Sequence, residues 1–365
     1  VFQKMQKRNA NVPLKNGNSI LNDCNIKNKG GKRKIGNNSH NSLPDDKVRK
    51  LNFENRFKHE FSENFLAKWG VKFSDDFYDF YYFTQQNPES DIDAVGLAFT
   101  GPYDVLTGKI KKETELTKVE LYMHGRFYYD LPEIITLLYS KDDDGFHIGY
   151  FRDAPDDVPQ ILVSNHSKKN GDLSICGDNI FAAVYGYSKK LLSKETRLTK
   201  SINLFIKHLE LFAKDHGYSL AATSQKIKER NKKVKAICLN KIGLVIPVDK
   251  NGVGYRELPC SEKELKKLLQ KITNAENDDL KNEAFDELQE IITLVQFAND
   301  ECDYGMGYEL GVNLFSHGDE SLNRIILHLL PLAYRLMGYE LYSDILEKHL
   351  IDRKKDVSRS IITNV

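Results

Sequence analysis

The spacing of apolar residues changes along this chain, and that change limits the folds it can adopt. Between Ala94 and Tyr187, short apolar and aromatic stretches alternate with Gly, Pro and Asp turns, which is typical of a sheet. From Ile202 to Leu350, apolar residues recur at the three- and four-residue intervals of amphipathic helices. The expected fold class is α+β: an N-terminal mixed α/β domain with a sheet, followed by a mainly helical C-terminal domain with a β-hairpin.

The pattern also places individual elements. Apolar spacing predicts one helix over Phe53–Trp69 and a second over Asp76–Phe83, which Ser74 caps. The expected strands are Val95–Phe99, Glu120–His124, Phe127–Tyr129, Ile134–Leu138 and Phe146–Phe151. The expected later helices are Ile202–His216, Ser261–Ile272, Glu283–Ala298, Leu322–Leu336 and Leu341–Leu350.

A hairpin is expected between these later helices. The apolar stretch Gly243–Val248 is followed by an Asn-Gly turn at Asn251, and Val253–Leu258 returns. Tyr255 and Arg256 then lie just beyond a tight loop.

Charge divides the chain into an arm and a body. Residues 1–50 carry nine Lys and three Arg against three Asp, a net charge of +9, while the rest carries 41 basic against 49 acidic residues, a net charge of −8. The arm has few large apolar residues, so we expect a disordered basic tail over 1–50, an α/β domain over 51–190 and a helical domain over 191–365. The cluster from Lys27 to Lys34 is either a nuclear address, a weak contact with nucleic acid, or a solvated tail.

The cysteines indicate a reducing compartment. Their spacing matches neither a zinc site nor the framework of a small disulfide-rich domain, and Cys24 with His40 alone cannot make a zinc finger. No apolar run approaches the roughly 20 residues of a membrane span, so no membrane contact is expected. The five cysteines are Cys24, Cys176, Cys238, Cys260 and Cys302.

An acidic cluster follows the apolar face that ends at Val295. Asp300, Glu301 and Asp303 gather where the negative end of a helix dipole disfavours anions. Acidic residues at a position that the helix dipole disfavours indicate a functional site. A solvated acidic loop, or caps for neighbouring helices, is the alternative reading of the spacing.

Other candidate motifs fail. The glycine-containing segment Gly305–Gly311 is expected to be a loop, but it follows a helix and its third glycine is one residue late for a dinucleotide fingerprint. No Walker loop or nucleophile motif is present. The aromatic stretch Arg126–Asp130 is expected in the core.

Five blocks carry a resemblance that spacing alone cannot supply. In this order along the chain, they resemble the histone PARylation factor family, and the likeness runs from about Phe73 to Leu350. The blocks are Gly101–Leu106, Arg126–Asp130, Gly149–Asp153, Val253–Pro259 and Gln296–Gly307.

The resemblance implies an accessory factor with no activity alone. Such a factor binds the catalytic domain of a poly-ADP-ribose polymerase and completes a joint active site for serine ADP-ribosylation of histones and other proteins in the DNA damage response. By resemblance, Glu301 is the general base. The polymerase binds NAD, whereas no cofactor or metal is expected on this chain, and the expected location is chromatin at DNA damage sites in the nucleus.

The resemblance also assigns partner-binding residues. Asp300 matches an aspartate that contacts the polymerase, Tyr255 and Arg256 match a pair needed for the complex, and Asp303 matches a further acidic position. Arg324 stands where vertebrate members carry Lys, so it keeps the charge. Because a guanidinium can bridge two acids, we expect carboxylates of the acidic cluster to hold Arg256.

Two other functions compete with this interpretation. A non-catalytic adaptor would dock the polymerase on chromatin and use the acidic cluster only for binding. A free-standing hydrolase would use Asp300 and Glu301. However, adjacent side chains on a helix diverge by about 100°, so the two carboxylates would not both face the bond to be cleaved.

Overall fold

The computed structural model describes residues 58, 61–86, 88–111, 114–193 and 199–355. The predicted tail over 1–50, with Cys24 and His40, lies outside the described residues, as does the start of the helix expected at Phe53. The strands are β1 Leu97–Phe99, β2 Ile134–Ser140, β3 Phe146–Phe151, β4 Ile161–His166, β5 Ser174–Gly177, β6 Val234–Ala236 and β7 Leu244–Val245. The first helices are α2 Asp75–Thr84, η1 Pro88–Ser90, η2 Ile92–Val95, α3 Tyr103–Leu106, α4 Lys118–Met123, α5 Ile180–Leu192 and α6 Thr199–Asp215. The later helices are α7 Gln225–Lys233, α8 Glu262–Thr273, α9 Asp278–Asp300, α10 Gly305–His317, η3 Glu320–Leu322, α11 Asn323–Leu336 and α12 Glu340–Asp352.

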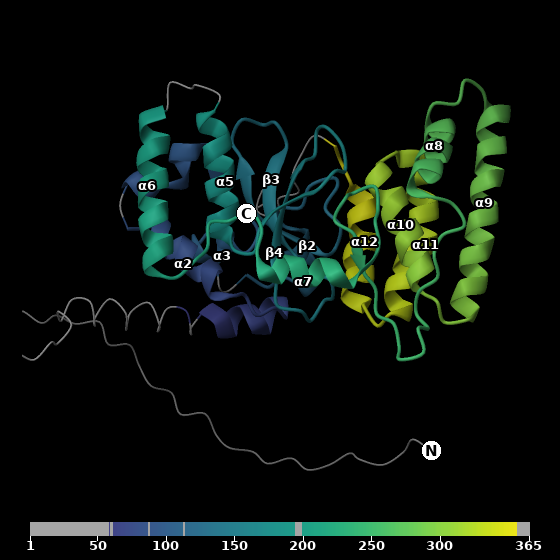
Figure 1. The fold of residues 1–365 in the computed structure, drawn as a ribbon, viewed down its shortest axis with the longest axis horizontal. Coiled ribbons are helices and arrows are strands. Elements are labelled where there is room, and N and C mark those ends of the chain that lie inside the picture. The colour runs from purple at the N-terminus through teal and green to yellow at the C-terminus, as the bar shows by residue number, and fades with distance from the viewer. Residues whose placement is uncertain (1–57, 59–60, 87, 112–113, 194–198, 356–365) are drawn as a thin grey trace, which may run out of the picture. The chain divides into compact units, whose positions relative to one another are not determined.

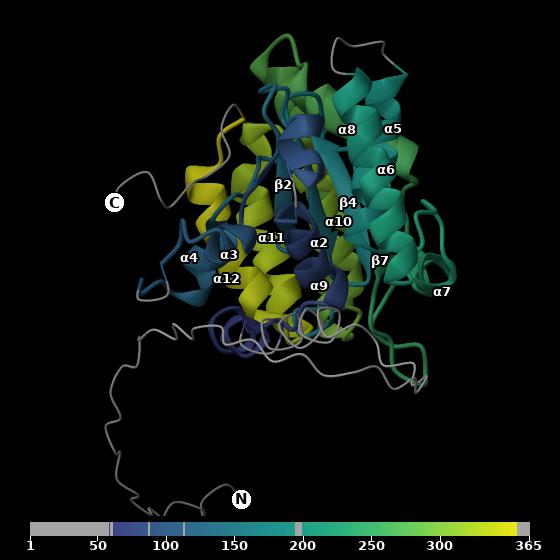
Figure 2. The same ribbon diagram turned by 90° about the vertical axis from the view of Figure 1, so that its left-hand side faces the viewer.

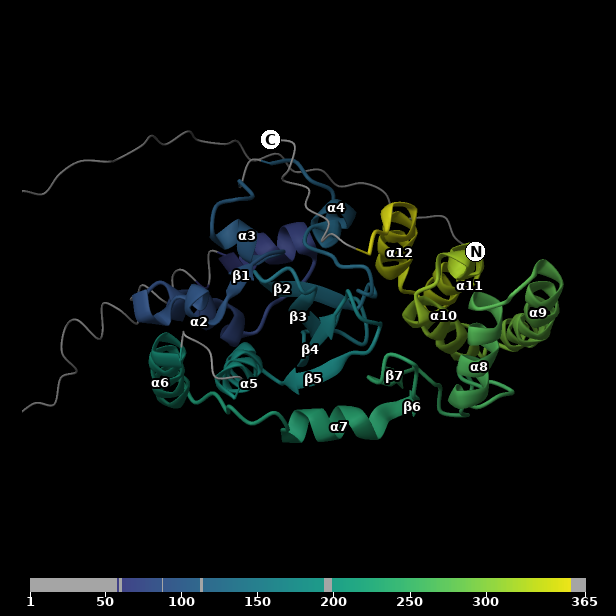
Figure 3. The same ribbon diagram turned by 90° about the horizontal axis from the view of Figure 1, so that it is seen from above.

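Five antiparallel strands in the order β1-β2-β3-β4-β5 form the main sheet (Figures 1 and 3). The predicted α+β class is therefore confirmed, and β1 to β3 fall at predicted positions. The strand expected over Glu120–His124 is wrong, because Thr117 and Glu120 form a reciprocal capping box that starts helix α4. The expected strand Phe127–Tyr129 is a turn.

The two faces of the sheet pack on different elements. Ile135, Tyr150 and Leu162 are cross-strand neighbours in the main core. On the same side, the buried Asp76 of α2 accepts hydrogen bonds from the Tyr150 hydroxyl and the Ile180 amide at the start of α5, both at 2.8 Å. Asp76 thereby joins α2, β3 and α5, and α6 packs beside α5 (Figure 2).

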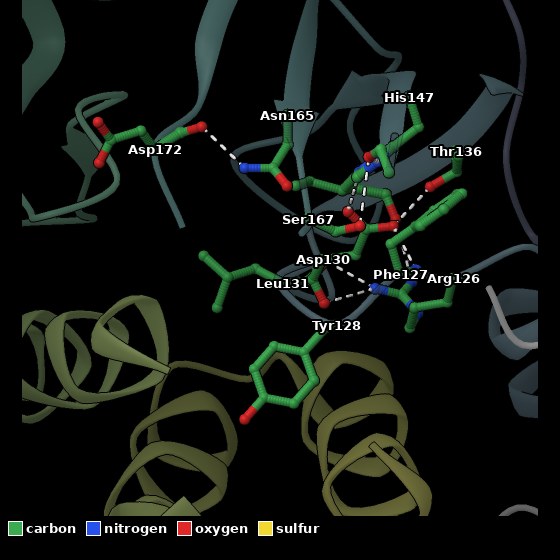
Figure 4. A network of polar contacts seen from close by, with 12 residues as sticks. Arg126, Phe127, Tyr128, Asp130, Leu131, Thr136, His147, Asn165, Ser167 and Asp172 are labelled. Atoms are coloured by element: carbon green, nitrogen blue, oxygen red, sulfur yellow. Dashed lines mark hydrogen bonds and ion pairs between the residues drawn. The ribbon is translucent and has the colours of Figure 1, made fainter. Parts of the chain in front are cut away.

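A polar network under the sheet fixes the segment between α4 and β2 (Figure 4). The buried Arg126 donates to the backbone carbonyls of Tyr122, Asp130, Leu131 and Ile134 at 2.8–3.0 Å. Burial raises the pKa of Asp130, but His147 and the hydrogen bonds to the carboxylate outweigh burial and lower that pKa to about 2. The expectation that Arg126–Asp130 belongs to the core is confirmed.

Helices α9, α10 and α11 form a series of antiparallel neighbours. Gly311 of α10 faces Leu330 of α11 and Gly307 faces Ala333, so the two helices run in opposite directions. The segment Gly305–Gly311 is therefore the first part of α10, and its expectation as a loop is wrong.

The predicted hairpin is also misplaced. Residues Leu244–Val245 pair with Val234–Ala236, and Val253–Leu258 forms no strand. The Asp249 carboxylate accepts the Val253 amide at 2.9 Å and closes the turn locally, after which the chain packs on the junction of α9 and α10.

Buried side chains join the sheet region to the C-terminal helices. Tyr308 of α10 and Tyr334 of α11 both donate to Oε1 of the buried Glu133, at 2.6 and 2.8 Å. Because the main core includes residues from both parts, the packing continues across residue 190. The division of the chain at that residue stays a prediction.

Candidate functional site

The acidic cluster lies at the end of α9, and the way this helix ends positions it. The Asp303 amide donates to the Ala298 carbonyl at 2.8 Å and the Cys302 amide to the Asn299 carbonyl at 3.1 Å. These two bonds make a Schellman motif, with Cys302 in the left-handed conformation at φ 68°. The chain therefore reverses directly after Glu301, and Asp303 turns back toward the helix end.

Residues 253–258, which we call the strap, lie against this reversal. The Gly254 amide donates to Oδ1 of Asp303 at 3.0 Å, and the Gly254 carbonyl accepts the Gly305 amide at 2.9 Å. Gly254 has φ 132°, and a Cβ there would collide with the Pro247 carbonyl oxygen. A glycine at this position therefore lets the strap pass close to the backbone of Pro247 and Val248.

Gly254→Ala is expected to lower the free energy of unfolding by about 2–3 kcal/mol, since it adds a backbone collision to an unfavourable φ. Urea denaturation at neutral pH measures this loss. Gly252→Ala is a matched control because Gly252 also has positive φ, at 85°, but open space around it. Its expected loss is about 1 kcal/mol. Equal losses in the two variants would contradict the proposed constraint from Pro247.

Arg256 of the strap joins two carboxylates of the cluster. One guanidinium nitrogen, Nη2, contacts Oε2 of Glu301 and lies 3.0 Å from Oδ2 of Asp303. The hydrogen bond to Glu301 raises the pKa of Arg256, so the guanidinium stays charged. The expectation that the acidic cluster holds Arg256 is confirmed. The Glu301 side chain is 60% exposed, so another molecule can reach it.

Tyr255 anchors the strap to α10 through a residue that the sequence did not single out. Its hydroxyl donates to Oε2 of Glu309 at 2.9 Å. Burial raises the pKa of Glu309 to about 7, and nearby Glu257 adds to that effect. Glu309 stands four residues after Gly305 on α10, so its helical spacing could have indicated a side chain facing the strap.

Glu309 is expected to make stability depend on pH. Its folded-state pKa of about 7 lies above the ordinary value of 4.5, so the folded chain binds more protons between these values. The stabilising contribution is present below pH 4.5 and is lost as the pH rises through about 7. Urea denaturation at pH 5 and pH 7.5 should therefore show a smaller decrease for Glu309→Gln than for the unmodified chain. The exposed Glu290→Gln serves as control, and identical pH dependence in all three proteins would rule out this role.

The two remaining predicted site residues are placed differently. Asp300 is exposed on the last turn of α9, beside Glu301. Arg324 is exposed near the start of α11. Because α11 runs antiparallel to α10, Arg324 lies beside the far end of α10, about 20 Å from the Glu301 end by helix rise. The structure thus gathers Tyr255, Arg256, Asp300, Glu301 and Asp303 but not Arg324, and the binding roles of all six stay predictions.

The surface around Glu301 is open. A hollow of about 400 Å³ adjoins it, lined by residues that include Gly254, Cys302 and Met337. Within the described ranges, no group of three or more His, Cys, Asp or Glu side chains is arranged to hold a metal ion. No described helix is both long enough and apolar enough to cross a membrane.

Comparison with known proteins identifies similar chains. A family model described as Histone PARylation factor 1 matches residues 55–353. A Mus musculus protein named Histone PARylation factor 1 is 42% identical over 290 residues, which cover 77% of this chain and 84% of the relative. A Danio rerio protein of the same name is 38% identical over 338 residues, which cover 89% of this chain and 97% of the relative. A Homo sapiens protein named Putative histone PARylation factor 1-like is 41% identical over 290 residues, which cover 77% of this chain and 83% of the relative.

Proposed function

This chain belongs to the histone PARylation factor 1 family, and from that premise we propose that it completes the active site of a poly-ADP-ribose polymerase. The chain binds the catalytic domain of the polymerase and supplies Glu301 as a general base for serine ADP-ribosylation. The observation that carries this proposal is the exposed Glu301 carboxylate, held at a helix end by Arg256 on an open surface. Such a surface provides a catalytic group but little enclosure, and the partner supplies the rest.

The chemistry requires a base because a serine hydroxyl is almost never ionised near neutral pH. NAD, bound by the polymerase, supplies the ADP-ribosyl group. Nicotinamide leaves with the electron pair of its bond to ribose C1′, and the serine oxygen forms the new bond to that carbon. The proton of the hydroxyl passes to Glu301. General-base assistance of this kind contributes about 10²- to 10⁴-fold in rate.

Arg256 and Asp303 position this base. Asp303 fixes the strap through the Gly254 amide, and the strap presents Arg256 to Oε2 of Glu301. Among the described residues, Oε1 of Glu301 has no hydrogen-bond partner. In the joint site, Arg256 therefore restrains one carboxylate oxygen while the other accepts the proton.

The acidic surroundings of Glu301 fit a basic acceptor. Asp300 and Asp303 lie beside the base, so a lysine next to the target serine meets complementary charge. Histone tails are acceptors of this type. The proposed setting is accordingly chromatin at sites of DNA damage in the nucleus.

Reconstitution tests the proposal directly. The full chain is mixed with a polymerase, NAD and a histone peptide, and mass spectrometry identifies the modified amino acid. Modified serine is expected only when the chain is present. The proposal would be overturned if serine were modified equally well without the chain, or if no serine were modified in either mixture.

A further inference from the structure

A second surface, remote in sequence from Glu301, carries concentrated positive charge. Helix α7 and strand β6 contain five exposed lysines within ten residues, although the body of the chain is acidic overall. Figure 3 shows α7 beyond β5, at the periphery of the described chain. The five residues are Lys226, Lys228, Lys232, Lys233 and Lys235. We call them the lysine face.

Nearby carboxylates neutralise the lysine face only in part: Asp76 and Asp153 interact at longer range with Lys226 and Lys233, and Glu229 is the one acidic residue on the helix itself. Within the part of the chain that the structure describes, none of the five ammonium groups forms an ion pair. The single acidic residue of α7, Glu229, accepts a hydrogen bond from Gln225 at 2.9 Å. Lys226 and Lys228 also lie in the first two turns of α7, whose first turn holds no acidic residue. The positive end of the helix dipole disfavours cations there, so local stability does not explain their placement.

The opposite side of α7 holds the helix rigidly. Arg230 is buried and donates to both carboxylate oxygens of Asp153, at 2.9 and 2.7 Å. It also donates to the carbonyls of Ile242 and Gly243. Ile227 packs in a smaller apolar cluster, separate from the main core, with Ile134 of β2, Phe151 of β3 and Ile161 of β4. A helix with so little apolar surface is thus fixed by two buried side chains.

This anchoring determines where the lysines point. At 100° per residue, the four lysines of α7 fall within an arc of about 160° that excludes Ile227 and Arg230. The helix is about 13 Å long, and duplex DNA carries one negative charge per about 1.7 Å of its axis. A face of this length therefore spans several consecutive phosphates of a duplex.

We propose that the lysine face of α7 and β6 binds the phosphate backbone of duplex nucleic acid without sequence preference. Single-stranded nucleic acids are bound through aromatic side chains on which bases stack. Residues 225–237 contain no aromatic side chain, so the face suits a backbone with its bases paired inside. This inference does not depend on the proposed role of Glu301.

Fluorescence anisotropy with a 20-base-pair duplex tests the proposal on the full chain. One variant carries Gln at all five positions of the lysine face. Its affinity at 100 mM salt is expected to be weaker by about tenfold or more. The slope of log affinity against log salt should become shallower by up to about 4.5, since each of the five phosphate contacts contributes about 0.9.

The matched control removes the same charge from other helices. It carries Gln at Lys207, Lys214, Lys263, Lys266 and Lys267, which are exposed on α6 and α8. Both variants keep residues 1–50, so their difference reports the lysine face. Equal affinities and slopes in the two variants would overturn the proposal. Tighter binding of a single strand than of the duplex through the same lysines would also overturn it.

Discussion

Glu301→Gln is expected to reduce serine ADP-ribosylation by the reconstituted mixture by about 10²- to 10⁴-fold. The amide keeps the size of the side chain and can still contact Arg256, but it cannot take the proton of a serine hydroxyl. Asp303 continues to hold the strap through Gly254 and Arg256, so the surface keeps its shape. The initial rate of serine modification on a histone peptide measures the effect.

This variant separates catalysis from docking. Its affinity for the polymerase, measured by calorimetry, should change little, because only one of the carboxylates beside Arg256 is altered. Glu290→Gln, on the exposed side of the same helix, is the control and should retain full activity. A Glu301→Gln chain that supports serine modification at the normal rate would favour the non-catalytic adaptor.

The class of the fold followed from local pattern, but some elements did not. The short apolar and aromatic stretches of β2 and β3, which turn residues separate, and the apolar spacing of α9 and α11 placed these elements correctly. Glu120–His124 was misassigned because its aromatic content resembles a strand, while the capping box from Thr117 starts a helix. Strand β5 was missed since it is short and only partly buried, so it lacks a strong apolar signal.

Only part of the site could be predicted from the sequence. The acidic residues at the end of α9 could be predicted as a site because anions are disfavoured at the negative end of a helix dipole. The family resemblance added the link to Arg256. The predicted hairpin nevertheless placed the strap wrongly: an Asn-Gly turn predicts strand pairing, whereas Gly254 pairs with Asp303 and Gly305. Such contacts between distant segments depend on tertiary packing, which local propensity does not encode. Glu309 was not predicted because Gly305–Gly311 was expected to be a loop, in which a four-residue spacing does not place side chains on one face.

Arg256→Ala is expected to weaken polymerase binding by about thirtyfold or more, because arginines at the centre of an interface carry a large share of its affinity. Without the guanidinium, Glu301 and Asp303 lose their shared cation and repel each other on the face that must meet the partner. The fold should persist. Arg256 is about half exposed, and the strap keeps its bonds from Gly254 to Asp303 and from Tyr255 to Glu309. Calorimetric titration measures affinity, and thermal unfolding checks the fold.

Two further variants show whether geometry or charge matters. Arg335→Ala removes an arginine of similar exposure, which lies on α11 and pairs with Glu347 of α12. This variant should bind the polymerase normally if affinity depends on the strap. Arg256→Lys keeps the charge but replaces the planar fork with a single ammonium, which contacts two carboxylates less well. It should bind with intermediate affinity. Normal binding by Arg256→Ala would remove Arg256 from the interface, and equal weakening by Arg335→Ala would reduce the effect to net charge.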